Sequence, residues 1–89
     1  MLGNQPARSD SAPLVLIVED DPETRQLYVT LFESAGFRTD AAHNGLQALE
    51  KANATTPDLI LTDIAVPGID GIELCRRLRS SKQTEGIPL

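Results

Sequence analysis

The chain has 89 residues, a length that suits one small domain with a modest core. Its 13 Asp and Glu residues outnumber its 8 Lys and Arg residues, and the formal net charge of −5 disfavours nonspecific binding to nucleic acid or to anionic membranes. The sequence has one cysteine, no apolar run near the ~20 residues of a membrane span and no apolar core of a signal peptide, so we expect a cytoplasmic protein without an internal disulfide.

The N-terminal stretch differs in composition from the rest of the chain. Residues 1–13 are mostly polar, with glycine and proline among them, and they predict a disordered tail. The domain predicted to follow covers residues 14–89. It begins with Leu14–Val18, five consecutive aliphatic residues that are typical of a strand buried on both faces of a parallel sheet.

A helix is predicted soon after this strand. Asp21 is suited to cap the free N–H groups of a helix, and Pro22 suits its first position because proline has no N–H to satisfy there. Gly36 suits the left-handed position that follows a helix end. The predicted apolar face consists of Leu27, Tyr28, Leu31, Phe32 and Ala35.

A weaker strand and a second helix come next. Phe37–Ala42 alternates only weakly between apolar and polar side chains and predicts a strand at a sheet edge. Asn44, with Gln47 three residues later, resembles a capping pair, and the helix is predicted to end near Ala54, shortly before Pro57. Its predicted apolar face consists of Leu46, Leu49 and Ala52.

The third predicted strand, Leu59–Thr62, is apolar and is followed by the acid Asp63 and by turn residues. Asp70 with Glu73 then resembles another capping pair, so a third helix is predicted to follow. Ile87–Leu89 resembles the first residues of a further strand. The predicted inner face of the third helix consists of Ile72, Cys75 and Leu78.

The order of these elements predicts an α/β fold. Three strand-helix pairs and the start of a fourth strand favour a doubly wound parallel sheet with right-handed crossovers. If the first strand lies between the other two, the acids that follow the first and third strands share one crevice at the carboxyl ends. That order places Glu19, Asp20 and Asp63 together.

Three carboxylates in one crevice repel each other, so they require either a divalent cation or a proton on one of them. Ligation by oxygen alone favours Mg²⁺. Beside such a cation, Asp63 is suited to attack a phosphoryl group and form an acyl phosphate. The alternative is that the acids after the first strand only cap the next helix, the interpretation that we favour for Asp21.

Together these motifs resemble the receiver domain of two-component response regulators. The resemblance runs from Leu14 to Leu89 in the family's order, and the motif around the third strand is quite specific. The residues that carry it are Leu16–Asp21, Arg25, Asn44, Gly45, Ala48, Leu49, Pro57–Asp63 and Pro67–Gly71.

The resemblance implies a flavodoxin-like (CheY-like) fold that is incomplete at its C-terminal end. It also implies a signalling module, not an enzyme, that accepts a phosphoryl group from a sensor histidine kinase or a phosphotransfer protein. By resemblance, Asp63 matches the phosphoacceptor. Glu19 and Asp20 match the acidic pair that binds Mg²⁺. Ala65 matches the position whose backbone carbonyl ligates the metal together with Asp63.

The sequence also departs from the family pattern. The family's Thr or Ser after the fourth strand and its Lys after the fifth have no counterpart here, and Lys82 does not match that lysine. One alternative is therefore a degenerate, non-phosphorylated interaction fragment. A second is a Mg²⁺-dependent aspartyl-phosphate phosphatase, which usually has a second Asp where this chain has Ala65. An incomplete sheet also leaves the third strand with an open edge, which predicts self-association.

Overall fold

The computed structural model describes residues 12–63 and 69–89. In these residues three strands alternate with three helices, as the sequence predicts, and none of the helices is long and apolar enough to cross a membrane. The elements are β1 (Leu14–Val18), α1 (Pro22–Ser34), β2 (Arg38–Ala42), α2 (Gly45–Thr55), β3 (Leu59–Thr62) and α3 (Gly71–Arg79).

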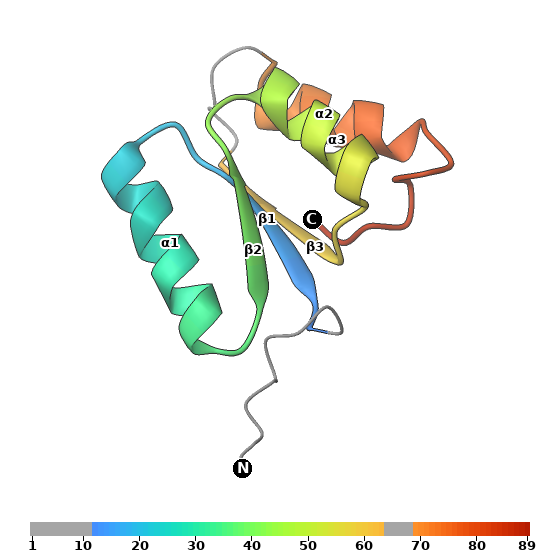
Figure 1. Ribbon diagram of the computed structural model, residues 1–89. Helices are drawn as coiled ribbons and strands as arrows, with labels where there is room; N and C mark the ends of the chain where they lie inside the picture. Colours follow the sequence, from blue (N-terminus) through green and yellow to red (C-terminus); the bar gives the residue numbers. More distant parts are fainter. Residues whose placement is uncertain (1–11, 64–68) are drawn as a thin grey trace.

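The strands form one parallel sheet in the order β2-β1-β3. β1 is the central strand, and its Leu16 lies opposite Asp40 of β2 and Ile60 of β3. Helix α1 lies on one side of the sheet, while α2 and α3 lie next to each other on the other side (Figure 1). This topology confirms the predicted strand order and the doubly wound, flavodoxin-like fold.

The main core lies between the sheet and the layer formed by α2 and α3. Successive residues of a strand point to opposite faces, so Leu16 and Val18 face this layer, whereas Val15 and Ile17 face α1. All four are at most 1% exposed, which explains why β1 is apolar without alternation. The core cluster consists of Leu16, Val18, Ala42, Ala48, Ala52, Ile60, Leu74, Leu78 and Ile87.

Each helix begins at a polar cap that the sequence predicts. The capping side chain accepts a hydrogen bond from a backbone N–H of the first turn, which would otherwise have no partner. After α1, Gly36 adopts a φ of 95°, the left-handed conformation that glycine tolerates best. The capping pairs are Asp21 with Thr24 at 2.9 Å, Asn44 with Gln47 at 2.7 Å and Asp70 with Glu73 at 2.9 Å.

The faces that α2 and α3 bury agree with the predicted ones only in part, since Ala52 and Leu78 are buried as predicted. Ile72, predicted to face inward, is 68% exposed, and Leu46 is 53% exposed. In α2, small residues lie closest to the core and Leu46 beside them turns outward, whereas α3 buries Leu74 and Leu78 in place of Ile72. The buried residues are Gly45, Ala48 and Ala52 in α2, and Gly71, Leu74 and Leu78 in α3.

Helix α1 has an apolar face that the rest of the described chain covers poorly. No residue of α1 is buried, and Leu27 and Leu31 are 56% and 55% exposed. Phe32 contacts Phe37 edge to face, with the ring centroids 5.6 Å apart. The predicted apolar face therefore exists, but part of it is open to solvent.

The last residues run along the outer edge of β3. The backbone N–H of Ile60 donates to the carbonyl oxygen of Pro88 at 2.9 Å, and Ile87 packs into the core. The structure assigns no strand to residues 87–89. The predicted start of a fourth strand thus lies beside β3 without forming a regular ladder.

The chain enters the sheet at Ala12, which is buried. Arg38 donates from its side chain to the carbonyl oxygen of Ala12 and from its backbone to that of Pro13, both at 2.8 Å. These two residues of the predicted tail therefore contact β2. Residues 1–11 lie outside the described part of the chain, so a disordered tail ahead of a domain at 14–89 stays a prediction.

Candidate functional site

Asp63 lies at the carboxyl end of β3, as the sequence predicts. Its backbone N–H donates to the carbonyl oxygen of Val18, the last residue of β1, at 3.4 Å. Because β1 and β3 are parallel neighbours, the residues that follow them leave the sheet at the same edge. Asp63 is exposed at this edge and is therefore accessible to a reaction partner.

Glu19 follows β1 and is held at three points. Its backbone N–H donates to the carbonyl oxygen of Ala42 at 2.9 Å, and its carbonyl oxygen accepts a bond from the Arg25 guanidinium at 3.0 Å. Its carboxylate accepts a bond from the backbone N–H of Asp21 at 3.1 Å. Glu19 is 8% exposed, and acids buried to this extent are usually paired, hydrogen-bonded or metal-bound.

Asp20 and Asp21 have different environments from Glu19. Both are exposed. The Asp21 carboxylate accepts hydrogen bonds from the Thr24 hydroxyl at 2.6 Å and from the Thr24 backbone N–H at 2.9 Å. These bonds, with a smaller contribution from the Arg25 charge, hold the pKa of Asp21 below its usual value. The interpretation of Asp21 as a helix cap is therefore confirmed.

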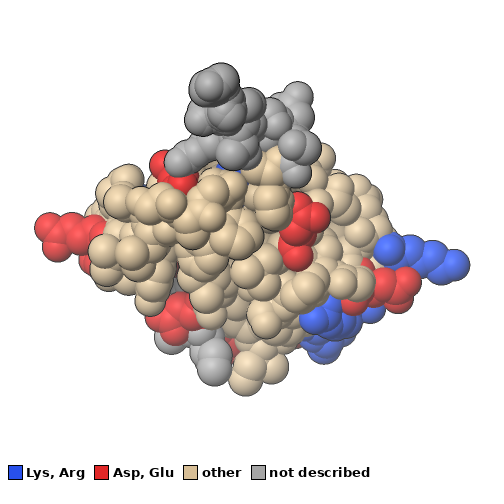
Figure 2. All heavy atoms as spheres, turned by 90° about the horizontal axis from the view of Figure 1, so that it is seen from below, with Lys and Arg blue, Asp and Glu red and all other residues tan. Residues whose placement is uncertain are grey.

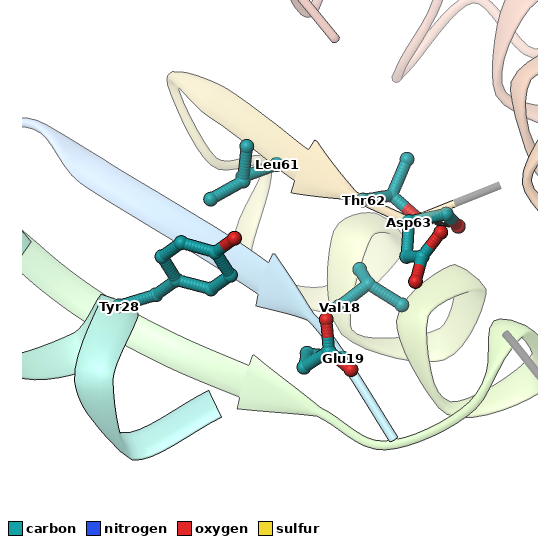
Figure 3. A pocket seen from close by; sticks show the side chains of 6 residues that line it. All are labelled: Val18, Glu19, Tyr28, Leu61, Thr62 and Asp63. Atoms are coloured by element: carbon teal, nitrogen blue, oxygen red, sulfur yellow. Dashed lines mark hydrogen bonds between the residues drawn. The ribbon is translucent and has the colours of Figure 1, made fainter. Parts of the chain in front are cut away.

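A cavity of about 330 Å³ opens between the ends of β1 and β3. Glu19 and Asp63 line it from neighbouring strands, and the Tyr28 ring reaches toward it from α1 (Figure 3). The sequence did not reveal Tyr28, because it fits the apolar spacing of its helix. The one available signal was its hydroxyl, which needs polar surroundings. The other lining residues are Val18, Leu61 and Thr62.

The donor chemistry of this cavity fits a hard divalent cation. Glu19 and Asp63 offer carboxylate oxygens, the ligands that Mg²⁺ prefers. Among the residues that the structure describes, no three His, Cys, Asp or Glu side chains come together as a metal-binding group. Asp20 does not line this cavity, and its place among the metal ligands stays a prediction. Ala65, the source of the predicted carbonyl ligand, lies outside the described residues.

Gly45, the first residue of α2, packs closely against Ile69, which lies just before α3. A Cβ at this position would overlap the backbone carbonyl oxygen and the side chain of Ile69. Such a close approach of two backbones requires glycine. It accounts for the glycine of the Asn44-Gly45 motif.

A second hollow, of about 400 Å³, adjoins the first and is apolar. Tyr28 and Leu61 line both hollows. The other lining residues of the second hollow are Leu31, Phe32, Ala35 and Phe37.

Sequence comparisons with known proteins point to one family. A family model described as the response regulator receiver domain matches residues 15–88. The transcriptional regulatory protein CseB of Streptomyces avermitilis is 43% identical over 75 residues, which are 84% of this chain and 32% of that protein. Hybrid signal transduction histidine kinase D of Dictyostelium discoideum is 40% identical over 77 residues, which are 86% of this chain and 5% of that protein. This chain therefore spans about a third or less of these curated relatives.

Solved structures of receiver domains share the fold. The N-terminal domain of a response regulator receiver protein from Methanoculleus marisnigri has a TM-score of 0.83 and 38% identity, covering 88% of this chain and 63% of that one. The receiver domain of sensor histidine kinase PA1611 from Pseudomonas aeruginosa has a TM-score of 0.83 and 28% identity, covering 88% of this chain and 64% of that one. That structure has a magnesium ion coordinated in its active site cleft.

Proposed function

This chain belongs to the response regulator receiver domain family of signalling modules, and from that membership we propose that Asp63 is its phosphoacceptor. The phosphoryl group comes from a phosphohistidine of a sensor histidine kinase or of a phosphotransfer protein. The observation that carries the proposal is the shared cavity: Asp63 at the end of β3 and Glu19 at the end of the neighbouring β1 line the same space.

The chemistry required of Asp63 is the displacement of a leaving group from phosphorus. One carboxylate oxygen of Asp63 forms a bond to phosphorus while the bond between phosphorus and the donor imidazole nitrogen breaks. The imidazole leaves with the electron pair of that bond, and the product is an aspartyl phosphate. The exposure of Asp63 at the sheet edge lets a donor histidine approach.

We further propose that Glu19, Asp20 and Asp63, with the backbone carbonyl of Ala65, hold Mg²⁺. When bound, this ion offsets the repulsion between the Asp63 carboxylate and the phosphoryl oxygens. The buried carboxylate of Glu19 and the all-oxygen donor set support this proposal. The magnesium ion in the cleft of the PA1611 receiver domain supports it by similarity.

Incubation with Mg²⁺ and acetyl phosphate tests the proposed function. We expect mass spectrometry of the intact chain to show the gain of one phosphoryl group, and EDTA to prevent this gain. Acetyl phosphate replaces the kinase, so the test does not require the cognate donor. A folded chain that takes no label contradicts the proposal and favours a non-phosphorylated interaction fragment. Loss of label after the donor is removed measures the slow self-dephosphorylation that we propose as the chain's other activity.

The same assay separates the module from a Mg²⁺-dependent aspartyl-phosphate phosphatase. Such an enzyme usually has a second Asp two residues after the nucleophile, and this chain has Ala65 there. Alanine has no proton to donate to a leaving group and cannot activate a water molecule. We therefore propose no turnover of phosphate esters, and multiple turnovers would favour the phosphatase instead.

The outer edge of β3 supports a proposal of self-association. Beyond β3, the described residues form no further strand, and the bond from Ile60 to Pro88 covers part of the edge. Exposed strand edges pair with other chains, and the exposed Leu27 and Leu31 add apolar surface on the α1 side. We expect sedimentation velocity to show the 89-residue chain as a dimer or larger species. A dilute monomer that melts cooperatively contradicts this expectation.

We also propose that the module acts in the cytoplasm and that this segment binds neither nucleic acid nor membrane. The net charge of −5 disfavours both kinds of anionic partner. The face in Figure 2 carries most of its basic side chains at one end, with acidic side chains beside them. On α3, Arg76 and Arg77 both donate to the carboxylate of Glu73, so their charges are partly neutralised.

A further inference from the structure

Arg25 reaches from the first turns of α1 back to the end of β1. Its Nη1 donates to the carbonyl oxygen of Glu19 at 3.0 Å and lies 3.5 Å from that of Asp20. Its backbone N–H donates to the carbonyl oxygen of Asp21 at 2.9 Å, as part of the helix start. The Arg25 side chain thus contacts the backbone of Glu19 and Asp20, and its main chain contacts that of Asp21.

We propose that Arg25 is a positioning residue for the acidic pair Glu19 and Asp20, an inference that rests on the proposed function. The turn that carries these acids lies between a strand and a helix, so neither element's regular hydrogen bonds fix it. Ala42 and Asp21 hold the backbone N–H and the carboxylate of Glu19, and Arg25 holds its carbonyl. Without Arg25, this buried residue loses one of its three anchors.

Geometry and charge predict opposite effects of Arg25 on Mg²⁺ binding. A cation close to the metal site repels Mg²⁺, so removal of the charge alone should tighten binding. If Arg25 positions the acids, its removal should weaken binding, because groups that orient metal ligands typically contribute 10–100-fold in affinity. The direction of the change therefore separates the two roles.

Arg79 provides a matched control. Its Nη1 also donates to two backbone carbonyl oxygens, those of Glu85 at 2.7 Å and Ile87 at 2.6 Å. These contacts lie after α3, and none of the three residues lines the acidic cavity. Arg79→Gln removes the same charge and the same kind of backbone contact as Arg25→Gln, away from the proposed metal site.

The test is a Mg²⁺ titration of the metal-free chain followed by the amide NMR signals of Glu19, Asp20 and Asp63. We expect Arg25→Gln to raise the Kd for Mg²⁺ about tenfold or more. Arg79→Gln should change it less than about twofold, because its contacts are remote. Arg25→Lys should restore most of the affinity, because both contacts of Arg25 come from one nitrogen that an ammonium group can replace.

The titration distinguishes failure of this inference from failure of the proposed function. Unchanged or tighter binding by Arg25→Gln, with normal binding by the parent, overturns the role of Arg25 alone. A parent chain whose signals do not respond to Mg²⁺ overturns the metal site and the positioning role together. Circular dichroism confirms folding of each variant, and the osmolyte TMAO is added to all samples if Arg25→Gln is less stable.

Discussion

Asp63→Asn is expected to abolish phosphorylation of the chain by acetyl phosphate. The substitution keeps the size and shape of the side chain but replaces the attacking carboxylate oxygen with a neutral amide, which is a poor nucleophile. It also removes one of the proposed Mg²⁺ ligands, so two contributions to the reaction are lost at once. The measurement is the intact mass of the protein after incubation with donor and Mg²⁺, and we expect no phosphoryl gain.

Asp58 supplies the matched control for this prediction. It lies immediately before β3, as Asp63 lies immediately after it, and its carboxylate accepts a hydrogen bond from the backbone N–H of Leu14 at 2.8 Å. Asp58→Asn keeps an oxygen that can accept this bond and is expected to leave phosphorylation intact. Label that persists in Asp63→Asn, or that disappears in Asp58→Asn, would contradict the assignment of the phosphoacceptor.

Leu16→Ala is expected to lower the free energy of unfolding by about 2–5 kcal/mol, the range for removing a buried leucine side chain. Leu16 is 0% exposed at the centre of β1 and belongs to the core cluster under α2 and α3. Small domains have a total stability of about 5–15 kcal/mol, so this loss is a large fraction of it. The Leu16→Ala variant should therefore unfold at a clearly lower urea concentration than the parent. Urea denaturation followed by circular dichroism measures the change.

Leu31→Ala tests whether this loss depends on burial and not on residue type. Leu31 is 55% exposed on α1, so its truncation removes little apolar area from the interior and should cost less than about 1 kcal/mol. Both variants are compared with the parent at one protein concentration, so that any self-association affects all three similarly. Equal losses for the two leucines would mean that the α1 face is covered in solution.

The strands and the helix starts could be predicted because local chemistry determines them. The unbroken aliphatic run of β1 matches a strand buried on both faces, and its bounds agree with the structure at both ends. Asp21, Asn44 and Asp70 cap their helices through bonds to residues three positions away. Such short-range preferences do not depend on the rest of the fold.

The buried helix faces could not be predicted as well, because they depend on what packs against each helix. In α3, the apolar spacing allows two neighbouring faces, one with Ile72 and one with Leu74. The structure buries Leu74, together with Gly71 and Leu78, and leaves Ile72 outside. The spacing in α1 likewise predicts an apolar face and does not say whether anything covers it.

The candidate site was predicted in part. Glu19 and Asp63 could be brought together from the sequence, because the strand order β2-β1-β3 places the ends of β1 and β3 side by side. The orientation of Asp20 depends on the turn between β1 and α1, which no sequence pattern determines. Tyr28 was missed since its place in the wall of the cavity follows from the packing of α1 on the sheet.

Helix α1 should be more mobile than the other two helices, because so little of it is buried. Segments with few buried apolar contacts undergo local opening at lower free energy than the rest of a domain. Helix α1 buries no residue, whereas α2 and α3 pack onto the main core, so α1 should separate from the sheet first. Arg25 and Tyr28 would move with it, while Asp63 stays attached to β3. Asp63 is therefore held more rigidly than Arg25 and Tyr28. A partner that covered Leu27 and Leu31 would stabilise α1 and, through Arg25, the turn that carries Glu19 and Asp20.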